Sequence, residues 1–434
     1  MNPLLSPRLP TQASRPTHPI LIGLAFLALA GLLTVLALND LLAAGALVYV
    51  ACFFLLAWRY PGAALLLIFA AAPFQNDLSG GSGARFSIAE INLMLTLPVL
   101  YVHWLRGERT PHVGPILVPV LLYFAVCAFS SMIHWDGATA LISLAQMFLY
   151  FVVAVMVFCV FTPDSRQYRP AFHVLVWVGV FLAVAGLTTG YWFIGLNKNG
   201  IADSLSCSFL VGVELIFTAE TKRWRQILSF ALLVIGVGLL FSLSRGAWLG
   251  TTGGVILLFA LRRKLRRLFQ LSLLMLPLLV VFWFALPEHS RDYASGFDQG
   301  HYNIKMRYQS IALAEKYFWQ SPIYGMGVGL RKDYDATNVL LMALAETGVL
   351  GLAAFLLIHA AFFRMIWKAQ KRVAPSEALF SFLCVGGALV LNKFLHGLVD
   401  HYWSRGAIMC TWAAAGMATR AYYVSKVRVQ GGRA

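Results

Sequence analysis

Two arginines could do chemistry in this chain, because each stands out against an otherwise apolar sequence. Arg245 lies between two apolar segments, in the stretch Ser-Leu-Ser-Arg-Gly-Ala-Trp at 242–248. Arg307 lies in the long polar stretch between Leu286 and Asn338. A guanidinium group presents a fixed fork of hydrogen-bond donors, which suits a diphosphate better than a lysine does. The alternatives are an interfacial anchor at Arg245 and a solvated surface charge at Arg307.

A second group of candidate residues lies late in the chain, in Phe-Leu-His-Gly-Leu-Val-Asp-His-Tyr-Trp at 394–403. His396 and Asp400 are four residues apart, so they share a helix face if the helix persists through Gly397. A carboxylate beside imidazole and cations can act as a general base, or it can hold a partner arginine in place. His401 is a further catalytic candidate in the same stretch.

Three other features invite a functional interpretation and have simpler alternatives. The glycine series at 325–329 resembles a phosphate-cradling loop, whereas a backbone hinge or loop packing is the alternative. The Asp-Tyr-Asp at 333–335 has the form of a metal-binding motif that is common by chance in polar loops. Glu214 and Glu346 lie inside apolar segments, where carboxylates mark pathways or ion pairs. We predict no metal site and no cofactor.

The composition excludes an ordinary soluble protein. The 434 residues are 59% hydrophobic and only 12% charged, with a mean hydropathy of +0.73. Lipid does not solvate backbone groups, so only helices or closed barrels span it, and these unbroken apolar runs favour helices. The net charge of +16 comes mostly from short loops, so we predict no nucleic-acid partner. The six cysteines lie in apolar runs and are interpreted as small buried thiols.

We predict an all-α, polytopic transmembrane bundle of about 12–14 spans, using the length that crosses a bilayer as the template. The apolar segments lie near 18–38, 41–58, 61–74, 88–105, 114–133, 139–161, 170–194, 203–220, 226–243, 247–261, 268–286, 338–363, 377–399 and 405–424. The polar stretch through His18 is too long and proline-broken for a signal peptide, so the first span is expected to be retained.

The distribution of Lys and Arg predicts which side each loop faces. Cationic loops alternate with cation-poor ones, and they lie near 8–15, 59, 106–109, 166–169, 222–225, 262–267, 364–372 and 420–428. This pattern requires an even number of spans with both termini in the cytoplasm. The predicted parts are a cytoplasmic tail at 1–17, transmembrane helices at 18–286, one large outer loop at 287–337, transmembrane helices at 338–424 and a cytoplasmic tail at 425–434.

The large outer loop is expected to contain an amphipathic helix over 303–319, lying on the bilayer surface with Arg307 beside its apolar stripe. The predicted stripe consists of Ile304, Tyr308, Ile311, Ala314 and Phe318. A cationic loop on the outer face is unusual in a membrane protein, which keeps most of its cations inside. We therefore interpret this loop as the receiver of an anionic lipid-linked substrate.

The stretch Ser-Arg-Gly-Ala-Trp-Leu-Gly at 244–250 resembles the signature of the O-antigen ligase and O-antigen polymerase superfamily. The resemblance continues through Arg307, then Ser-Pro-Ile-Tyr-Gly-Met-Gly-Val-Gly at 321–329 and Ala-Glu-Thr-Gly-Val-Leu-Gly-Leu at 345–352. It covers roughly residues 195–405. The family also has many spans and one large periplasmic loop late in the chain.

The resemblance implies a GT-C-like, metal-independent glycosyltransferase in the bacterial inner membrane, with its active site at the periplasmic face. Such enzymes take a glycan from undecaprenyl diphosphate, and an acceptor hydroxyl attacks the anomeric carbon with inversion. Ligases use the lipid A core as acceptor, polymerases use the next lipid-linked repeat, and a chain-length regulator is a further expected partner. The resemblance implies that Arg245 and Arg307 hold the donor diphosphate and that Asp400 matches an acidic residue of the family. We predict as catalytic residues Arg245, Arg307, Asp400 and His401. We predict as donor-binding residues Arg245, Arg307, Gly327, Arg331, Thr337 and Asn338.

One departure from the family bears on the choice between the two reactions. The family commonly has His-Asn before the Glu-x-Gly span, whereas this chain has Thr337-Asn338. It must do without that histidine or recruit His401, His301 or Asp335. The departure favours a surface-polysaccharide polymerase, for O-antigen or exopolysaccharide, with an O-antigen ligase as the alternative. An anion or sugar transporter is the candidate from another class, followed by a structural scaffold.

Overall fold

The computed structural model describes residues 41–74, 87–107, 112–134, 137–162, 168–191, 193, 196–296, 302–330, 337–400 and 406–431. Within these ranges the regular elements are all helical, and an isolated bridge between Phe193 and Leu196 is the one β-type pairing. The prediction of an all-α membrane bundle is confirmed.

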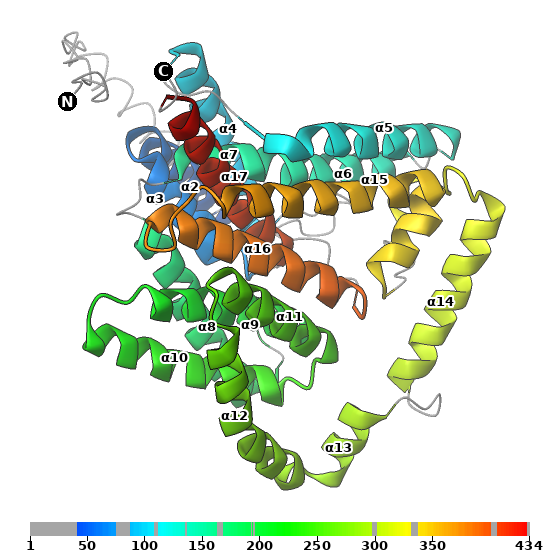
Figure 1. Cartoon of the computed structure of the whole chain (residues 1–434). Helices are drawn as coiled ribbons and strands as arrows, with labels where there is room; N and C mark the ends of the chain where they lie inside the picture. Colours follow the sequence, from blue (N-terminus) through cyan, green and yellow to red (C-terminus); the bar gives the residue numbers. More distant parts are fainter. Residues whose placement is uncertain are drawn as a thin grey trace, which may run out of the picture. The chain divides into compact units, whose positions relative to one another are not determined.

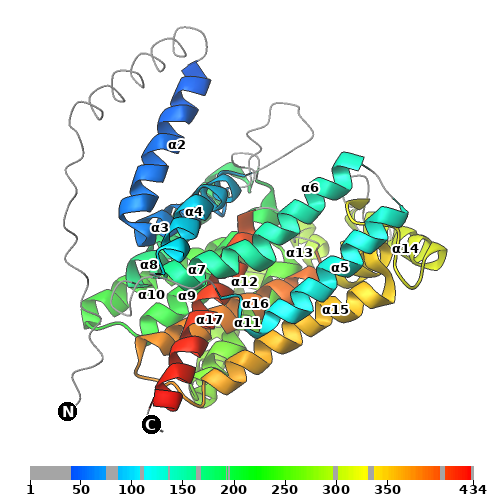
Figure 2. The same cartoon turned by 90° about the horizontal axis from the view of Figure 1, so that it is seen from above.

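The helices follow one another with short connections over most of the described chain (Figures 1 and 2). Their bounds are α2 Leu41–Arg59, α3 Pro61–Ala71, α4 Ile88–Leu105, η1 Gly114–Ile116, α5 Leu117–Ile133, α6 Gly137–Phe148, the π-helix η2 Leu149–Ala154, α7 Val155–Phe161, α8 Tyr168–Thr189, α9 Lys198–Phe217, α10 Lys222–Phe241, α11 Arg245–Leu261, α12 Leu265–Ala285, α13 Glu288–Ser295, α14 Tyr302–Gln320, α15 Val339–Ala369, α16 Ala378–Gly397 and α17 Gly406–Gly431.

Nine helices in the described ranges are long and apolar enough to cross a membrane, with α6, η2 and α7 together forming one of them. The predicted number was larger because it also counted α2, α3 and α11, which are shorter apolar helices. It further counted the segment 18–38, which lies outside the described residues, and α17, which is not among the nine.

The chain divides into two compact units, Met1–Leu56 and Ala57–Ala434. In the first unit, α2 is the described element. In the second, α16 packs against α9, α11 and α17, and these helices form its central layer. Two glycines of α11 allow a close approach, because a Cβ at Gly246 would lie 2.5 Å from His396 and one at Gly250 would lie 2.3 Å from Asn392. These contacts fix the start of α11 against the end of α16.

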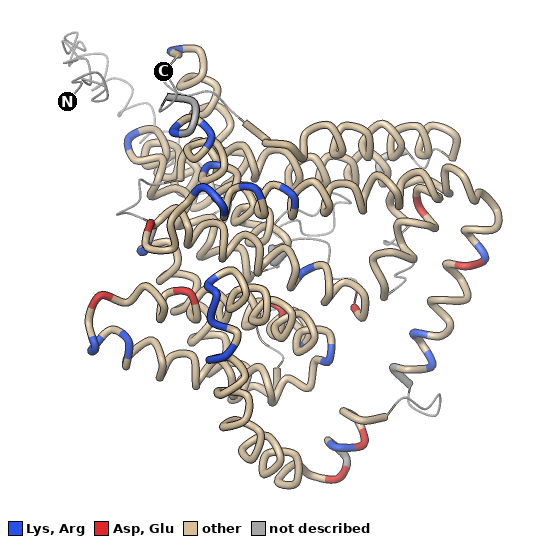
Figure 3. Tube along the Cα trace, viewed as in Figure 1, with Lys and Arg blue, Asp and Glu red and all other residues tan. Residues whose placement is uncertain are grey.

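The segment between α12 and α15 contains α13 and α14, and α14 confirms the predicted helix over 303–319. Figure 3 shows charges of both signs along these two helices. Of the predicted apolar stripe, Ile304 and Ala314 are buried, whereas Tyr308 is 50% exposed and Ile311 is 41% exposed. Ala314 packs against Met342 and Ala345 of α15. Contact of the stripe with the bilayer surface stays a prediction.

A break divides α15 at Gly348, whose φ of 62° and ψ of −164° are not helical. The glycine series at 325–329 fills this break. The N–H groups of Met326 and Gly327 donate to the carbonyls of Ala345 and Glu346, each at 2.9 Å. A Cβ at Gly348 would lie 2.4 Å from the backbone of Ile323. The glycine series therefore forms a packed loop at the break in α15, which was the alternative to a phosphate-cradling loop.

Candidate functional site

The turn that follows α16 collects the charged residues that the sequence singled out. Arg307 on α14 donates through Nη1 to the carbonyl of Val399, and its Nη2 lies 3.5 Å from Oδ2 of Asp400. The Arg307 side chain is 27% exposed and that of Asp400 is 13% exposed. This ion pair is therefore largely shielded from solvent. Asp400 thus holds a partner arginine, which was one of the two roles predicted for it.

Arg245 is the first residue of α11 and lies close enough to Arg307 for the two positive charges to repel each other. Its Nη1 donates to the carbonyl of Gly296 at 2.9 Å, so the end of α13 lies against it. Tyr293 of α13 also contacts Lys198 at the start of α9, through a hydrogen bond and a cation–π contact of 3.6 Å. The structure therefore brings the two predicted arginines together.

Two asparagines tie helix starts to the same turn. Nδ2 of Asn199, in the first turn of α9, donates to Oδ2 of Asp400 at 2.5 Å. Asn338 caps α15 by accepting from the N–H groups of Leu340 and Leu341, and its Nδ2 donates to the carbonyl of Leu398 at 2.9 Å. Thr337 precedes this cap with a φ of 52°.

The electrostatics of the site favour an anion. The N-termini of α9 and α15 contact the turn around Asp400, and the start of α11 packs against His396 just before it. A helix N-terminus carries a partial positive charge. Arg307 adds a full positive charge beside the Asp400 carboxylate, and Arg245 adds a second one near Arg307. Burial raises the pKa of Asp400 above its ordinary value, while the positive charges of His396, Arg307 and Lys393 act in the opposite direction. Such an arrangement can accept a diphosphate, as anions bind at helix N-termini with arginine forks.

A second charged group lies buried between α9 and α16. Nζ of Lys393 lies 2.5 Å from Oδ2 of Asp203, and Nδ1 of His396 lies 3.0 Å from Oδ1 of the same carboxylate. All three side chains are at most 1% exposed. His396 thus contacts Asp203, and the helical hydrogen bond from the Asp400 N–H to the His396 carbonyl keeps it one turn from Asp400, as its spacing predicted.

The glycine loop and Glu346 form a separate polar group at the break in α15. Oε1 of Glu346 accepts from the N–H of Gly329 at 2.8 Å. The N–H of Gly327 donates to Oγ of Ser130 at 2.8 Å and to the carbonyl of Glu346 at 2.9 Å. Gly327 was predicted to bind the donor, but its N–H is engaged in these protein contacts and it is not among the groups around Asp400.

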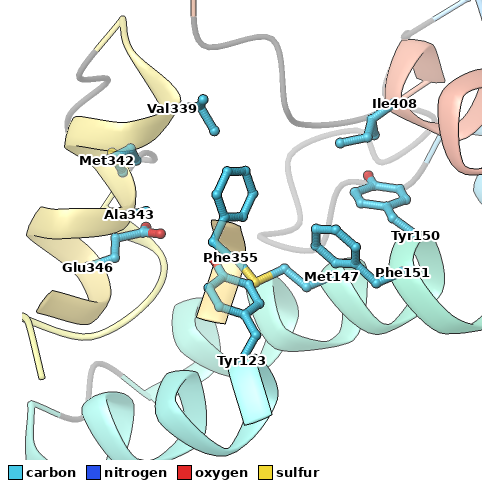
Figure 4. A pocket seen from close by; sticks show the side chains of 10 residues that line it. All are labelled: Tyr123, Met147, Tyr150, Phe151, Val339, Met342, Ala343, Glu346, Phe355 and Ile408. Carbon is cyan, nitrogen blue, oxygen red and sulfur yellow. The ribbon is translucent and has the colours of Figure 1, made fainter. Parts of the chain in front are cut away.

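A pocket lies beside the first part of α15, and the Glu346 side chain lines it (Figure 4). Its walls come mainly from aromatic and aliphatic side chains of α5, α6, η2, α15 and α17. The residues that line it are Tyr123, Met147, Tyr150, Phe151, Val339, Met342, Ala343, Glu346, Phe355 and Ile408. Val339 follows Asn338 directly, so the pocket begins next to one residue of the arginine site.

Some predicted residues have other outcomes. His401, Arg331, His301 and the Asp-Tyr-Asp at 333–335 lie outside the described residues. Glu214 forms a buried ion pair with Arg262, whose guanidinium also donates to Oγ of Ser381 at 3.1 Å, so the ion-pair alternative is confirmed there. The cysteines are free thiols, and all except Cys52 are buried.

The sequence interpretation missed several contributors to the site. Asn199 and Asp203 are not among the residues predicted from the sequence. The available signal was their spacing of four residues, which matches the spacing of His396 and Asp400. Asp203 and Lys393 also lie inside apolar segments, where opposite charges are expected to pair.

These features define the class of the protein: it is an all-helical, multi-pass membrane protein with a cationic site at the ends of its helices. Residues 230–356 match the Wzy_C family model, described as O-antigen ligase, so this part of the chain is similar to that family. The matched region contains Arg245, Arg307 and Asn338, whereas Asn199 and Asp400 lie outside it. A comparison with curated proteins gave no match.

Proposed function

We propose that the protein is a glycosyltransferase of the bacterial inner membrane with its active site at the periplasmic face. It moves a glycan from an undecaprenyl-diphosphate donor to an acceptor hydroxyl. The preferred assignment is a surface-polysaccharide polymerase, whose acceptor is a second lipid-linked repeat. The alternative is a ligase that uses the lipid A core. The family match supports transfer of a lipid-linked glycan as the reaction class.

The proximity of Arg245 to Arg307, which contacts the turn at Asp400, carries the proposal. These residues come from α11 and α14, which are separated in sequence by α12 and α13. Two neighbouring guanidinium groups repel each other unless an anion joins them. A diphosphate provides two adjacent anionic groups, each able to accept a fork of hydrogen bonds.

The proposed orientation is supported by where the cationic loops fall relative to this site. The starts of α9 and α15 contact the turn at Asp400 and the start of α11 packs against His396, so the opposite ends of these helices point away from the turn. The cationic stretches 222–225, 262–267 and 364–372 lie at or next to those opposite ends. Cytoplasmic loops of membrane proteins are enriched in Lys and Arg, so the arginine site belongs to the periplasmic side.

In the proposed reaction, the acceptor hydroxyl oxygen forms a bond to the anomeric carbon as the bond from that carbon to the diphosphate oxygen breaks. The electron pair of the broken bond stays on the diphosphate, and its charge is stabilised by Arg245 and Arg307. Preorganised donors of this kind typically contribute about 3–4 kcal/mol. Asp400, the carboxylate in contact with Arg307, accepts the proton of the hydroxyl.

Purified protein in detergent, mixed with an undecaprenyl-diphosphate-linked repeat, tests this assignment. We expect a ladder of longer lipid-linked glycans, and we expect the Arg245→Ala variant to lose it. Transfer to added lipid A core without a ladder would identify the ligase instead. Transport requires a sealed compartment, so turnover in detergent also separates transfer from the transporter alternative. A normal ladder from Arg245→Ala would refute the proposed role of this residue.

A further inference from the structure

The buried group between α9 and α16 forms a ladder of polar contacts that leads to the site. Asn199 contacts Asp400 at the outermost position. One helical turn deeper, Asp203 contacts Lys393 and His396. The spacing of Asn199 to Asp203 equals that of His396 to Asp400, so the two helices place these contacts one above the other.

A further contact continues the ladder toward the middle of α9. Oγ of Ser206 donates to Oδ1 of Asn392 at 2.7 Å and lies 2.6 Å from Oγ1 of Thr251. Thr251 belongs to α11, so the third helix of the site is joined to the same ladder. The ladder therefore connects α9, α11 and α16, three of the helices that reach the arginine site.

Stability is a poor explanation for the charged members of this ladder. Asp203 and His396 are fully buried and Lys393 is 1% exposed, so the ions have lost their hydration. Replacing such a buried ion pair with apolar side chains of similar volume is often neutral or stabilising. Leucine and methionine at these positions would pack the interface between α9 and α16 equally well.

The backbone links the buried group directly to Asp400 and to Arg245. The N–H of Asp400 donates to the carbonyl of His396 at 2.9 Å, which extends the last turn of α16 to the carboxylate. The His396 ring packs against Gly246, which follows Arg245. Any shift of His396 would therefore move both the Asp400 turn and the start of α11.

We propose that the Asp203–Lys393–His396 triad is the positioning group of the arginine site, fixing the Asp400 turn and the α11 start so that both arginines address one diphosphate. This inference rests on the proposed function and adds to it. The triad does not contact the substrate. The triad fixes the position of Asp400 and sets the charges that surround its carboxylate.

The charges that face Asp400 give the proposal a distinctive pH dependence. His396 and Lys393 on α16 and Arg307 on α14 lower the pKa of Asp400, whereas burial and Asp203 on α9 raise it. Asp400 must be ionised to hold Arg307, so transfer is lost as the pH falls through the pKa of Asp400. Removing the charge of Lys393 moves this acid limb to higher pH, and removing the charge of Asp203 moves it to lower pH.

The test compares pH profiles of single-turnover transfer for the wild type, Lys393→Met and Asp203→Asn. Relative to the wild type, we expect the acid limb to move to higher pH in Lys393→Met and to lower pH in Asp203→Asn. Each shift is expected to be roughly one pH unit, because a full charge is removed near a buried carboxyl. A loss of packing alone would not move the two limbs in opposite directions. Unchanged limbs, or limbs that move the same way, would overturn the proposal.

A charge-neutral double variant, Asp203→Leu with Lys393→Met, covers the case in which the single variants fold poorly. It leaves no buried charge of the ion pair unpaired, so we expect normal accumulation in the membrane and a loss of transfer of about tenfold or more. The matched control is Glu214→Leu with Arg262→Met, a buried ion pair that also joins α9 and α11. The control is expected to keep its transfer rate.

The outcomes separate this inference from the proposed function. If both the wild type and the triad double variant transfer glycan at the same rate, the proposed function is supported and the positioning role of the triad is refuted. A triad double variant that fails to accumulate while the control accumulates would also refute it, because the triad would then serve folding. Absence of transfer by the wild type would refute the proposed function itself.

Discussion

Arg307 offers the sharpest perturbation of the proposed site, because its guanidinium makes two contacts with the turn after α16. Nη1 donates to the carbonyl of Val399, and Nη2 pairs with Asp400 at 3.5 Å. Arg307→Ala removes both contacts together with one of the two positive charges that receive the diphosphate. Arg307→Lys keeps the charge but loses the fork, so it separates charge from geometry.

The expected magnitudes follow from these contacts. Removing one preorganised donor of a transition-state charge costs about 3–4 kcal/mol, so Arg307→Ala is expected to slow transfer by about 10²–10³-fold. The loss of one charge-assisted hydrogen bond costs roughly 1.5–3 kcal/mol of folding stability. We expect the lower end of that range, because Arg307 is 27% exposed and water screens part of the interaction. Arg307→Lys is expected to retain part of the activity.

The assay is single-turnover transfer between lipid-linked repeats by equal amounts of purified protein. Lys316→Ala is the matched control, since Lys316 is an exposed cation on the same helix α14. We expect the control to keep the wild-type rate. If Arg307→Ala transfers glycan as fast as Lys316→Ala, the reasoning about the arginine fork is wrong.

Three further predictions concern neighbouring features. Asn338→Asp keeps the cap on α15 but loses the hydrogen-bond donor to the Leu398 carbonyl, so we expect slower transfer with unchanged thermal stability. Asn338→Ala loses the cap as well, and we expect its free energy of unfolding in detergent to fall by about 0.5–2 kcal/mol. Gly348→Ala places a Cβ 2.4 Å from the Ile323 backbone at a φ of 62°, so we expect the free energy of unfolding to fall by more than about 1–3 kcal/mol. An unchanged melting temperature would contradict the packing of the glycine loop into the break at Gly348. Glu214→Ala leaves the largely buried Arg262 without its partner, and a loss of about 3–5 kcal/mol is expected in the same measurement.

Much of the fold follows from the sequence because lipid imposes a single rule on long apolar segments. Every backbone group must be satisfied within the segment, so apolar length predicts a helix. The helix over 303–319 was predicted from its spacing, but its packing through Ala314 against Met342 and Ala345 of α15 was not. Apolar periodicity shows that a face exists, whereas the side chains of α15 decide which face packs.

The site was only partly accessible from sequence, for a related physical reason. Arg245, Arg307 and Asp400 could be singled out because charges near apolar segments are costly. Their partners could not, because the contact from Asn199 to Asp400 joins residues 201 positions apart. The spacing of His396 and Asp400 placed them one helical turn apart, but it gave no sign of the contact between His396 and Asp203, 193 positions away. Local spacing therefore predicted the residue types and missed the pairing between helices.

We propose that Arg245 and Arg307 bind one diphosphate together. The most direct test compares the affinities of the protein for undecaprenyl diphosphate and undecaprenyl monophosphate. The measurement compares the purified wild type with Arg245→Ala, Arg307→Ala and the double variant. We predict that the wild type prefers the diphosphate, that either substitution removes this preference, and that the double variant loses less affinity than the sum of the single losses. A preference for the diphosphate that survives in both single variants, with purely additive losses, would contradict the account.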